Sequence, residues 1–159
     1  MDLAVKERVQ TLDKVNVRAG IIDFEKKFRE FDGSVEGKEL DKLCPLIHKF
    51  VEGAYIREIF VPKGTLLVTK THKVQHPYFA MKGDCSVLTE EGVVRIKAPY
   101  SGITQAGTKR IVYAHEDTVW VTVHVTKHKD LDQIEDEVIS KNFEEVEVTE
   151  KDLLKLKGA

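Results

Sequence analysis

The feature that most constrains the fold is a series of short apolar segments between Ala54 and Thr126. Apolar and polar residues alternate within them, and glycine, proline and aspartate turns separate them. The clearest turns are Pro62-Lys63-Gly64 and Lys82-Gly83-Asp84. Short strands punctuated at regular spacing are typical of an all-β sandwich or barrel, and about eight of them suit a double-sheet jelly roll. The sequence therefore predicts a mainly β jelly-roll barrel at residues 54–126.

The segments on either side of this barrel have helical patterns. Ile21, Phe24, Phe28 and Phe31 recur at steps of three and four, with Asp23 as a candidate N-cap and Asp32-Gly33 at the end of the run. A short helix needs a surface to cover, and we expect this one to cover the barrel or, alternatively, a second copy of the chain. After the barrel, Leu131, Ile134 and Val138 share one helical face, and Thr149–Asp152 resembles a capping signal. We therefore expect an N-terminal helical or irregular extension at 1–53 and a C-terminal helical tail at 127–159.

Composition excludes several classes of protein. The chain has 159 residues, enough for one core, and its 25 basic and 27 acidic side chains nearly balance. A generally basic nucleic-acid-binding protein would carry an excess of positive charge. No apolar run approaches the roughly 20 residues of a membrane helix, and the N-terminus does not resemble a signal peptide. Two cysteines are too few for a disulfide scaffold. We expect a cytoplasmic, single-domain protein.

The residues with the most informative spacing follow Gly64. Five residues separate Gly64 from Lys70, His72 comes two positions later, and His76 follows after three more residues. Six residues then lead to Gly83. A second group of residues, Gln105-Ala-Gly-Thr-Lys-Arg110, lies further along the chain.

These spacings resemble the two motifs of the cupin superfamily. The first motif is a glycine, five residues, His-x-His, three or four residues, a glutamate, six residues and a glycine; the second is centred on Pro-x-Gly-x-x-His. Here Lys70 stands at the first histidine, His76 at the glutamate, Gln105 at the proline and Arg110 at the last histidine. The resemblance covers about residues 54–126 and implies a cupin-like double-stranded β-helix.

Three segments, 55–65, 107–110 and 115–120, are also similar to small cupin-like proteins of tailed phages. This second resemblance implies a phage-encoded protein in the cytoplasm of a bacterial host. The cupin resemblance implies a homodimer. Neither resemblance brings a known biochemical role for this chain.

Strand alternation and the cupin resemblance together predict which side chains meet. Leu66, Val68, Lys70 and His72 repeat every second residue and share one face, which in cupins looks into the barrel. Along the last strand, either the valines at 119–125 form the core, or the polar face with Trp120 lines the mouth of a pocket. The predicted ligand-binding residues are Lys70, His72, His76, Tyr78, Arg110, Trp120 and His124.

The predicted pocket is suited to two kinds of ligand. Lys70 and Arg110 create a positive potential that suits a small anion such as a carboxylate or phosphate, with Tyr78 and Trp120 as an apolar wall. Alternatively, His72 and His76 hold a divalent metal such as Zn, Fe, Mn or Ni. A catalytic zinc site has three protein ligands, so a third donor would come from His124, His115 or Glu58.

Three functions therefore stay open at the level of sequence. The leading prediction is a small-molecule-binding protein that holds an anionic ligand beside a degenerate metal site. The first alternative is a metal-dependent cupin enzyme of the oxygenase, isomerase or lyase type that uses His72 and His76. The second is a structural or assembly protein with a vestigial pocket, in which Lys70 and Arg110 pair with buried acids such as Glu58 or Asp117.

Overall fold

The structure is a computed structural model that describes residues 3–140, with side chains described for residue 14 and for residues 16–140. Three helices are described, α1 (Leu3–Arg29), α2 (Lys38–Leu43) and α3 (Leu131–Val138). None of them is both long and apolar enough to cross a membrane. The strands in chain order are β1 (Leu46–Val51), β2 (Ala54–Val61), β3 (Leu66–Val68), β4 (Thr71–His72), β5 (His76–Lys82), β6 (Asp84–Thr89), β7 (Gly92–Lys97), β8 (Tyr100–Thr104), β9 (Ile111–Ala114), β10 (Thr118–Val125) and β11 (Ile139–Ser140).

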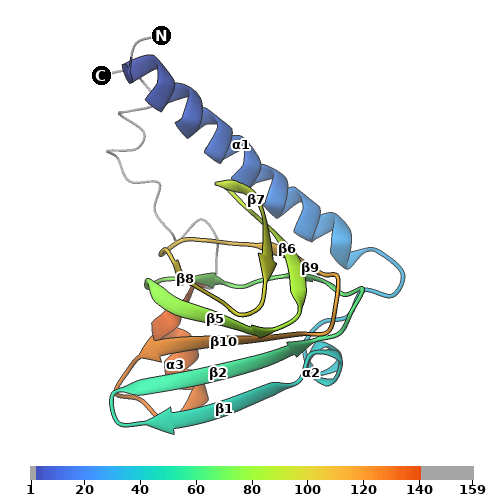
Figure 1. Cartoon of the computed structure of the whole chain (residues 1–159), viewed down its shortest axis with the longest axis vertical. Coiled ribbons are helices and arrows are strands. Elements are labelled where there is room, and N and C mark those ends of the chain that lie inside the picture. The colour runs from blue at the N-terminus through green and yellow to red at the C-terminus, as the bar shows by residue number, and fades with distance from the viewer. Residues whose placement is uncertain (1–2, 141–159) are drawn as a thin grey trace.

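Two antiparallel sheets form the body of the molecule (Figure 1). One has five strands in the order β1-β2-β10-β5-β8, and the other has four in the order β3-β9-β6-β7. Tyr78 and Ala80 of the first sheet pack against Cys85, Val87 and Val112 of the second, so the core lies between the sheets. The prediction of a mainly β, jelly-roll fold with helices at both ends is confirmed.

The first sheet begins earlier in the chain than the sequence pattern indicated. Strand β1 lies inside the segment expected to be helical or irregular, and it pairs with β2 from Leu46↔Ile59 to Val51↔Ala54. All of its residues except Leu46 are exposed, so an inward-facing apolar row is absent from this edge strand. This absence is why hydrophobic alternation did not reveal it.

Helix α1 is longer than the aromatic pattern predicted. Ile21 is buried, and Phe24 stacks on Phe28 at 5.5 Å between ring centroids, whereas Phe31 lies beyond the helix and is exposed. The helix runs beside β7 (Figure 1), and an ion pair of 3.0 Å joins Arg18 to Glu90. The expectation that this helix packs on its own barrel is confirmed by this ion pair and by a second one of 2.8 Å between Glu25 and Lys109. Phe31 lies 6.5 Å from the Phe28 ring and remains exposed.

The predicted helix after the barrel is α3, and it closes one end of the molecule. The side chain of Asp130 accepts hydrogen bonds from the backbone N–H groups of Asp132 and Gln133, which caps the first turn. Ile134 and Val138 pack with Tyr55, as their spacing predicted. The chain then forms β11, which pairs with β4. The capping signal at 149–152 lies outside the described residues.

Gly83 shapes the turn between the two sheets. Its φ of +97° lies in a region that residues with a side chain rarely adopt. A Cβ atom placed on it would lie 2.5 Å from Thr118 Oγ1 and 2.6 Å from the carbonyl oxygen of Asp117. Backbone conformation and close approach both require glycine at this position.

We predict that Gly83→Ala lowers the free energy of unfolding by about 3 kcal/mol, because strain at positive φ adds to overpacking. Gly92 is the matched control: its φ is +111°, yet a Cβ atom there meets nothing within 4 Å. Gly92→Ala should therefore cost only about 1–2 kcal/mol. Urea unfolding followed by tryptophan fluorescence measures both values, and equal losses would show that the close approach at Gly83 has no energetic effect.

Candidate metal centre

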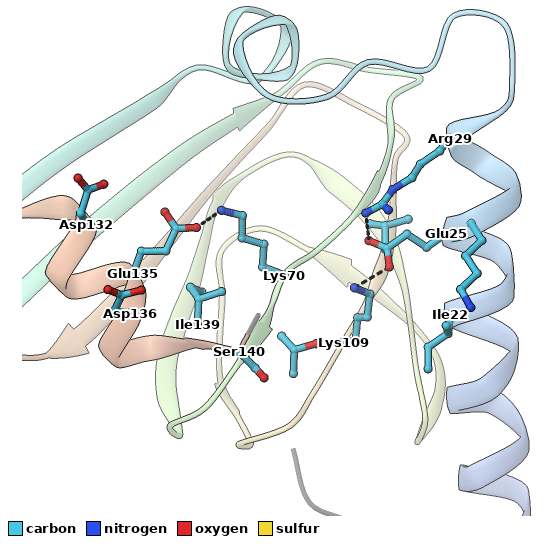
Figure 2. A pocket seen from close by; sticks show the side chains of 13 residues that line it. Ile22, Glu25, Arg29, Lys70, Lys109, Asp132, Glu135, Asp136, Ile139 and Ser140 are labelled. Carbon is cyan, nitrogen blue, oxygen red and sulfur yellow. Dashed lines mark hydrogen bonds and ion pairs between the residues drawn. The ribbon is translucent and has the colours of Figure 1, made fainter. Parts of the chain in front are cut away.

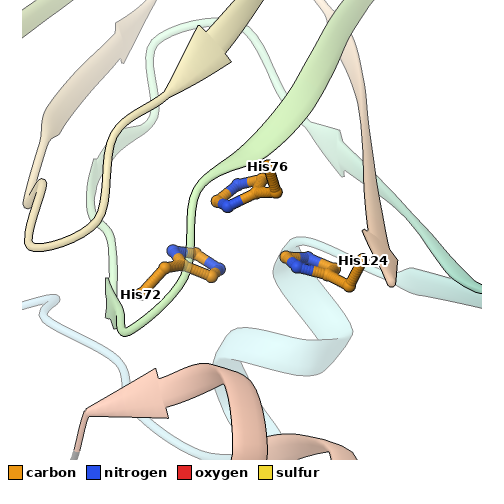
Figure 3. Close-up of side chains that lie close together, drawn as sticks. All are labelled: His72, His76 and His124. Carbon is orange, nitrogen blue, oxygen red and sulfur yellow. The ribbon is translucent and has the colours of Figure 1, made fainter. Parts of the chain in front are cut away.

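Three buried histidines meet at one end of the barrel. His72 of β4, His76 of β5 and His124 of β10 each offer a ring nitrogen, and these nitrogens all lie within 4.8 Å of one another. The ring centroids are 4.3 Å apart for His72 and His76, 4.4 Å for His76 and His124, and 5.3 Å for His72 and His124. Figure 3 shows the three imidazoles converging from separate segments of the chain.

Strand register explains how residues so distant in sequence converge. Thr122 of β10 lies opposite Tyr78 of β5, so two residues further along these antiparallel strands His124 comes beside His76. His72 is positioned by other contacts. It lies opposite Ile139 where β4 pairs with β11, and the carbonyl oxygen of His72 accepts a hydrogen bond of 2.8 Å from Gly107 N. Of the three candidates for a third metal donor, His124, His115 and Glu58, His124 is therefore the one that lies beside His72 and His76.

The other two candidates lie outside this cluster. His115 Nε2 is 2.8 Å from Ser86 Oγ, and the carboxylate of Glu58 faces Lys49 at 3.8 Å. Along β10, Thr118, Thr122 and His124 are buried, whereas Val125 is largely exposed. Of the two arrangements considered for this strand, the one with its polar face toward the cavity is confirmed.

Several ring nitrogens in the cluster have no hydrogen-bond partner among the described residues. His72 Nδ1, His72 Nε2 and His76 Nε2 are all buried without one. Buried polar atoms in proteins are nearly always satisfied, and each one left unpaired costs free energy. The Nδ1–H of His76 donates to the carbonyl oxygen of Val74 at 3.2 Å, which directs the lone pair of Nε2 into the cluster. This arrangement fits a metal ion bound by imidazole nitrogens.

The electrostatics of the cluster favour the form of histidine that binds metals. Burial lowers the pKa of His72 to about 2, with smaller contributions from His76, Arg57, His124 and Arg110. Burial, followed by His76 and Arg57, lowers the pKa of His124 to about 3. Burial also lowers the pKa of His76, although its hydrogen bond to Val74 opposes the shift. The three imidazoles are therefore neutral near pH 7, with lone pairs available for coordination.

Two cavities approach the cluster from different sides. A cavity of about 70 Å³ inside the barrel is lined by His72 and His76 together with Arg57, Arg110 and Trp120. A second, of about 210 Å³, reaches His72 and His124 from beneath α3 and is also lined by Arg57. Both are smaller than the 300 Å³ or more of typical drug-sized sites, so the space at the centre suits only a small ligand.

Arg110 occupies the barrel cavity as predicted. Its Nη2 donates to Thr104 Oγ1 at 2.8 Å, and its guanidinium lies 5.2 Å from the centre of the Tyr78 ring. Tyr78 in turn stacks on Trp120, with 4.6 Å between centroids. The structure thus brings these three predicted residues together.

Arg57 was not predicted, yet it lines both cavities. It points inward from β2 between Tyr55 and Ile59, and this lone cation on an otherwise apolar strand face is the sequence signal that could have revealed it. Within the described side chains, neither Arg57 nor Arg110 has a carboxylate within 4.0 Å. Burial lowers the pKa of both, and for Arg57 the charges of Tyr55 and Glu135 oppose this shift. Asp117, one proposed partner of Arg110, instead accepts a hydrogen bond from Lys63 N.

The expectation that Lys70 faces the barrel interior with His72 is wrong. Lys70 is 60% exposed and pairs with Glu135 of α3, across a groove that runs between α3 and α1 (Figure 2). The reason is a break in the strand: β3 ends at Val68 and β4 begins at Thr71, so the alternation shifts by one residue between them. Leu67, Thr69 and then His72 line the cavity, in place of the predicted even-numbered row.

Comparison with known proteins gives similarities at the level of structure. No known protein family and no curated protein matches the sequence. A cupin-2 domain protein of Shewanella frigidimarina is similar with a TM-score of 0.43 and 12% identity over 65% of this chain and 92% of that one. A cupin domain of Bordetella pertussis is similar with a TM-score of 0.42 and 17% identity over 52% of this chain and 93% of that one. An acetylacetone dioxygenase of Acinetobacter johnsonii is similar with a TM-score of 0.42 and 19% identity over 52% of this chain and 58% of that one.

These similarities are too distant to carry a function to this chain. The resemblance to phage proteins stays a prediction. The solved structures that this chain resembles thus include cupin-domain proteins.

Proposed function

We propose that this protein binds one divalent metal ion through His72, His76 and His124, and a small anion beside it through Arg57 and Arg110. The observation that carries the proposal is that ring nitrogens of His72 and His76, buried without hydrogen-bond partners among the described residues, converge with a ring nitrogen of His124. Imidazole ligands suit Zn, Fe and Ni among the metals expected from the sequence, whereas Mn prefers oxygen donors. When bound, such an ion would act as a Lewis acid toward a ligand that occupies its remaining coordination positions.

The arginines support the anionic half of the proposal. Arginine stays protonated in proteins, and a buried guanidinium without a carboxylate partner is costly to maintain. An anion in the cavity of about 70 Å³ would supply the missing negative charge and accept paired hydrogen bonds. The cavity size suits an anion as small as a carboxylate or phosphate group, and the stacked rings of Tyr78 and Trp120 would form its apolar wall.

A metal-dependent enzyme of the oxygenase, isomerase or lyase type is the second candidate. Catalytic zinc sites have three protein ligands and keep one position open, and the number of histidines in this cluster matches that pattern. In that case Arg57 and Arg110 would orient the substrate against the centre. If the chain is phage-encoded, a binding site without turnover would instead remove a small anion from the host cell.

We predict that full-length protein without a histidine tag, after loading and desalting, retains about one divalent ion per chain. His72→Ala, His76→Ala and His124→Ala should each lower the metal affinity by at least about 10–100-fold, because a ligand is lost. The matched control is His128→Ala, which removes an exposed imidazole outside the cluster. Metal analysis by mass spectrometry measures the content, and a folded wild-type protein that takes up no metal would refute the centre.

Metal removal should destabilise the protein, because the ion binds the folded chain preferentially. At a free-metal concentration 100 times the Kd this linkage contributes about 2.7 kcal/mol, equivalent to a Tm shift of roughly 5–10 °C. Thermal unfolding with and without a chelator measures the shift. The same comparison on His72→Ala should show almost none, and an equal shift there would place the metal elsewhere.

We predict that Arg57→Met and Arg110→Met each weaken binding of phosphate or acetate by at least about 10-fold, since a charged hydrogen bond contributes about 1.5–3 kcal/mol. Lys97→Met is the control, because this exposed cation of β7 lines neither of the two cavities that reach the histidines. Calorimetric titration of metal-loaded protein gives the affinities, and metal content is checked in parallel. If Lys97→Met weakens binding as much as the arginine variants, the anion site is not the one proposed.

A further inference from the structure

A groove of about 770 Å³ runs between α1 and α3, and we call it the interhelical groove. The two helices form its walls (Figure 2), and Val68, Lys70, Thr71 and Lys109 of the barrel lie between them. Its volume is within the range of about 300–1,000 Å³ that is typical of small-ligand sites, whereas the two cavities that reach the histidines are smaller. The interhelical groove therefore has room for a ligand of its own.

Opposite charges line the two sides of the interhelical groove. The α3 wall contributes three acids, which are Asp132, Glu135 and Asp136. The α1 side has three cations and one acid, which are Lys26, Arg29, Lys109 and Glu25. Glu25 pairs with Lys109 at 2.8 Å, and Arg29 pairs with Glu36 outside the groove at 2.6 Å. Among the described side chains, Lys26 and Asp132 have no oppositely charged partner within 4.0 Å. A ligand that complements both sides must carry a positive charge at one end and a negative charge at the other.

Two lysines between the walls determine how far apart the charges of the ligand must be. Lys70 pairs with Glu135 of α3, and Lys109 pairs with Glu25 of α1. Figure 2 shows both lysine side chains standing between the two helices. A free amino acid carries its ammonium and carboxylate groups on one carbon atom, so it cannot reach both walls past these side chains. A peptide of about three residues extends about 10 Å, which separates its two end charges far enough.

A buried hydroxyl group in the groove lacks a hydrogen bond that a peptide would supply. Thr71 is 3% exposed, and its Oγ1 has no hydrogen-bond partner among the described residues. Buried polar atoms nearly always have a partner, and each amide of a peptide offers a donor and an acceptor. Ile22, Val68 and Ile139 also line the groove, so an apolar side chain in the middle of the peptide has a surface to pack against.

We infer that the interhelical groove binds a short peptide with free ends and an apolar central residue. The ammonium group of the peptide pairs with Asp132, its carboxylate pairs with Lys26, and its backbone forms a hydrogen bond with Thr71. This site is separate from the metal centre, because Thr71 and His72 are neighbours in β4 and point to opposite sides of it. Thr71 lines the groove, whereas His72 lines the barrel cavity. Peptide binding therefore requires neither the metal nor the anion proposed above.

Calorimetric titration of the metal-free, full-length protein with the tripeptide Ala-Leu-Ala tests the inference. Acetylation of the peptide's N-terminus and amidation of its C-terminus each remove one end charge. Each change should weaken binding by at least about 10-fold, because a charge-assisted hydrogen bond is lost. Free alanine should bind at least about 10-fold more weakly than the tripeptide, and metal-loaded protein should bind the tripeptide with unchanged affinity.

Variants of the groove test which residue contacts which end of the peptide. Asp132→Asn should weaken binding by about 10-fold and remove most of the effect of N-terminal acetylation, and Lys26→Met should do the same for C-terminal amidation. Thr71→Val should weaken binding by about 3–10-fold through the lost hydrogen bond. The matched controls, Glu116→Gln and Lys63→Met, remove exposed charges outside the groove and should leave the affinity unchanged. Circular dichroism checks that each variant is folded.

Several results would overturn the peptide site. A folded wild-type chain that does not bind Ala-Leu-Ala would exclude it, and so would blocked peptides that bind as tightly as the free one. Control variants that weaken binding as much as Asp132→Asn and Lys26→Met would place the peptide elsewhere on the surface. Binding that appears only in metal-loaded protein would place it at the histidines, whereas failure of the metal centre alone would leave the groove unaffected.

Discussion

The burial of His72, His76 and His124 in one cluster is the constraint on which the rest of the site depends, because both ring nitrogens of His72 and Nε2 of His76 have no hydrogen-bond partner among the described residues. Three imidazoles crowded within 4.8 Å cannot all be protonated, and burial holds the pKa values of His72 and His124 at about 2 and 3. Neutral rings with unused lone pairs are unfavourable in a closed core unless another group satisfies them. The register of β10 against β5 and the pairing of β4 with β11 nevertheless bring them together, which makes the cluster the most informative feature of the molecule.

The charged side chains around the histidine cluster also differ in whether they have partners. Arg57 and Arg110 line the cavity beside the histidines and find no carboxylate among the described side chains, while Lys70 and Glu58 find partners outside it. A cation next to a metal ion would be repelled unless an anion lay between them. In the function we propose, metal binding and anion binding would therefore support each other.

Much of the barrel and part of the site could be predicted from the pattern of residues. Strands that alternate and end in Gly or Pro turns were recognisable, as was the helix with Leu131, Ile134 and Val138 on one face, because these signals are local. His72, His76, Arg110, Tyr78 and Trp120 were correctly grouped. Lys70 was misplaced, since a break in pairing between Val68 and Thr71 shifts the alternation and leaves no mark in the sequence. Strand β1 was missed because an exposed edge strand lacks an inward-facing apolar row.

By itself, the sequence determined the class of fold, the main turns, the near balance of charge and the identity of the side chains available for chemistry. These properties depend on periodicity and composition, which act over a few residues at a time. Only the tertiary structure decided that His124 completes the cluster, that Arg57 enters the cavity and that Lys70 pairs with Glu135 at the surface. Those outcomes depend on register between strands about 50 residues apart, and register is set by how the whole core packs.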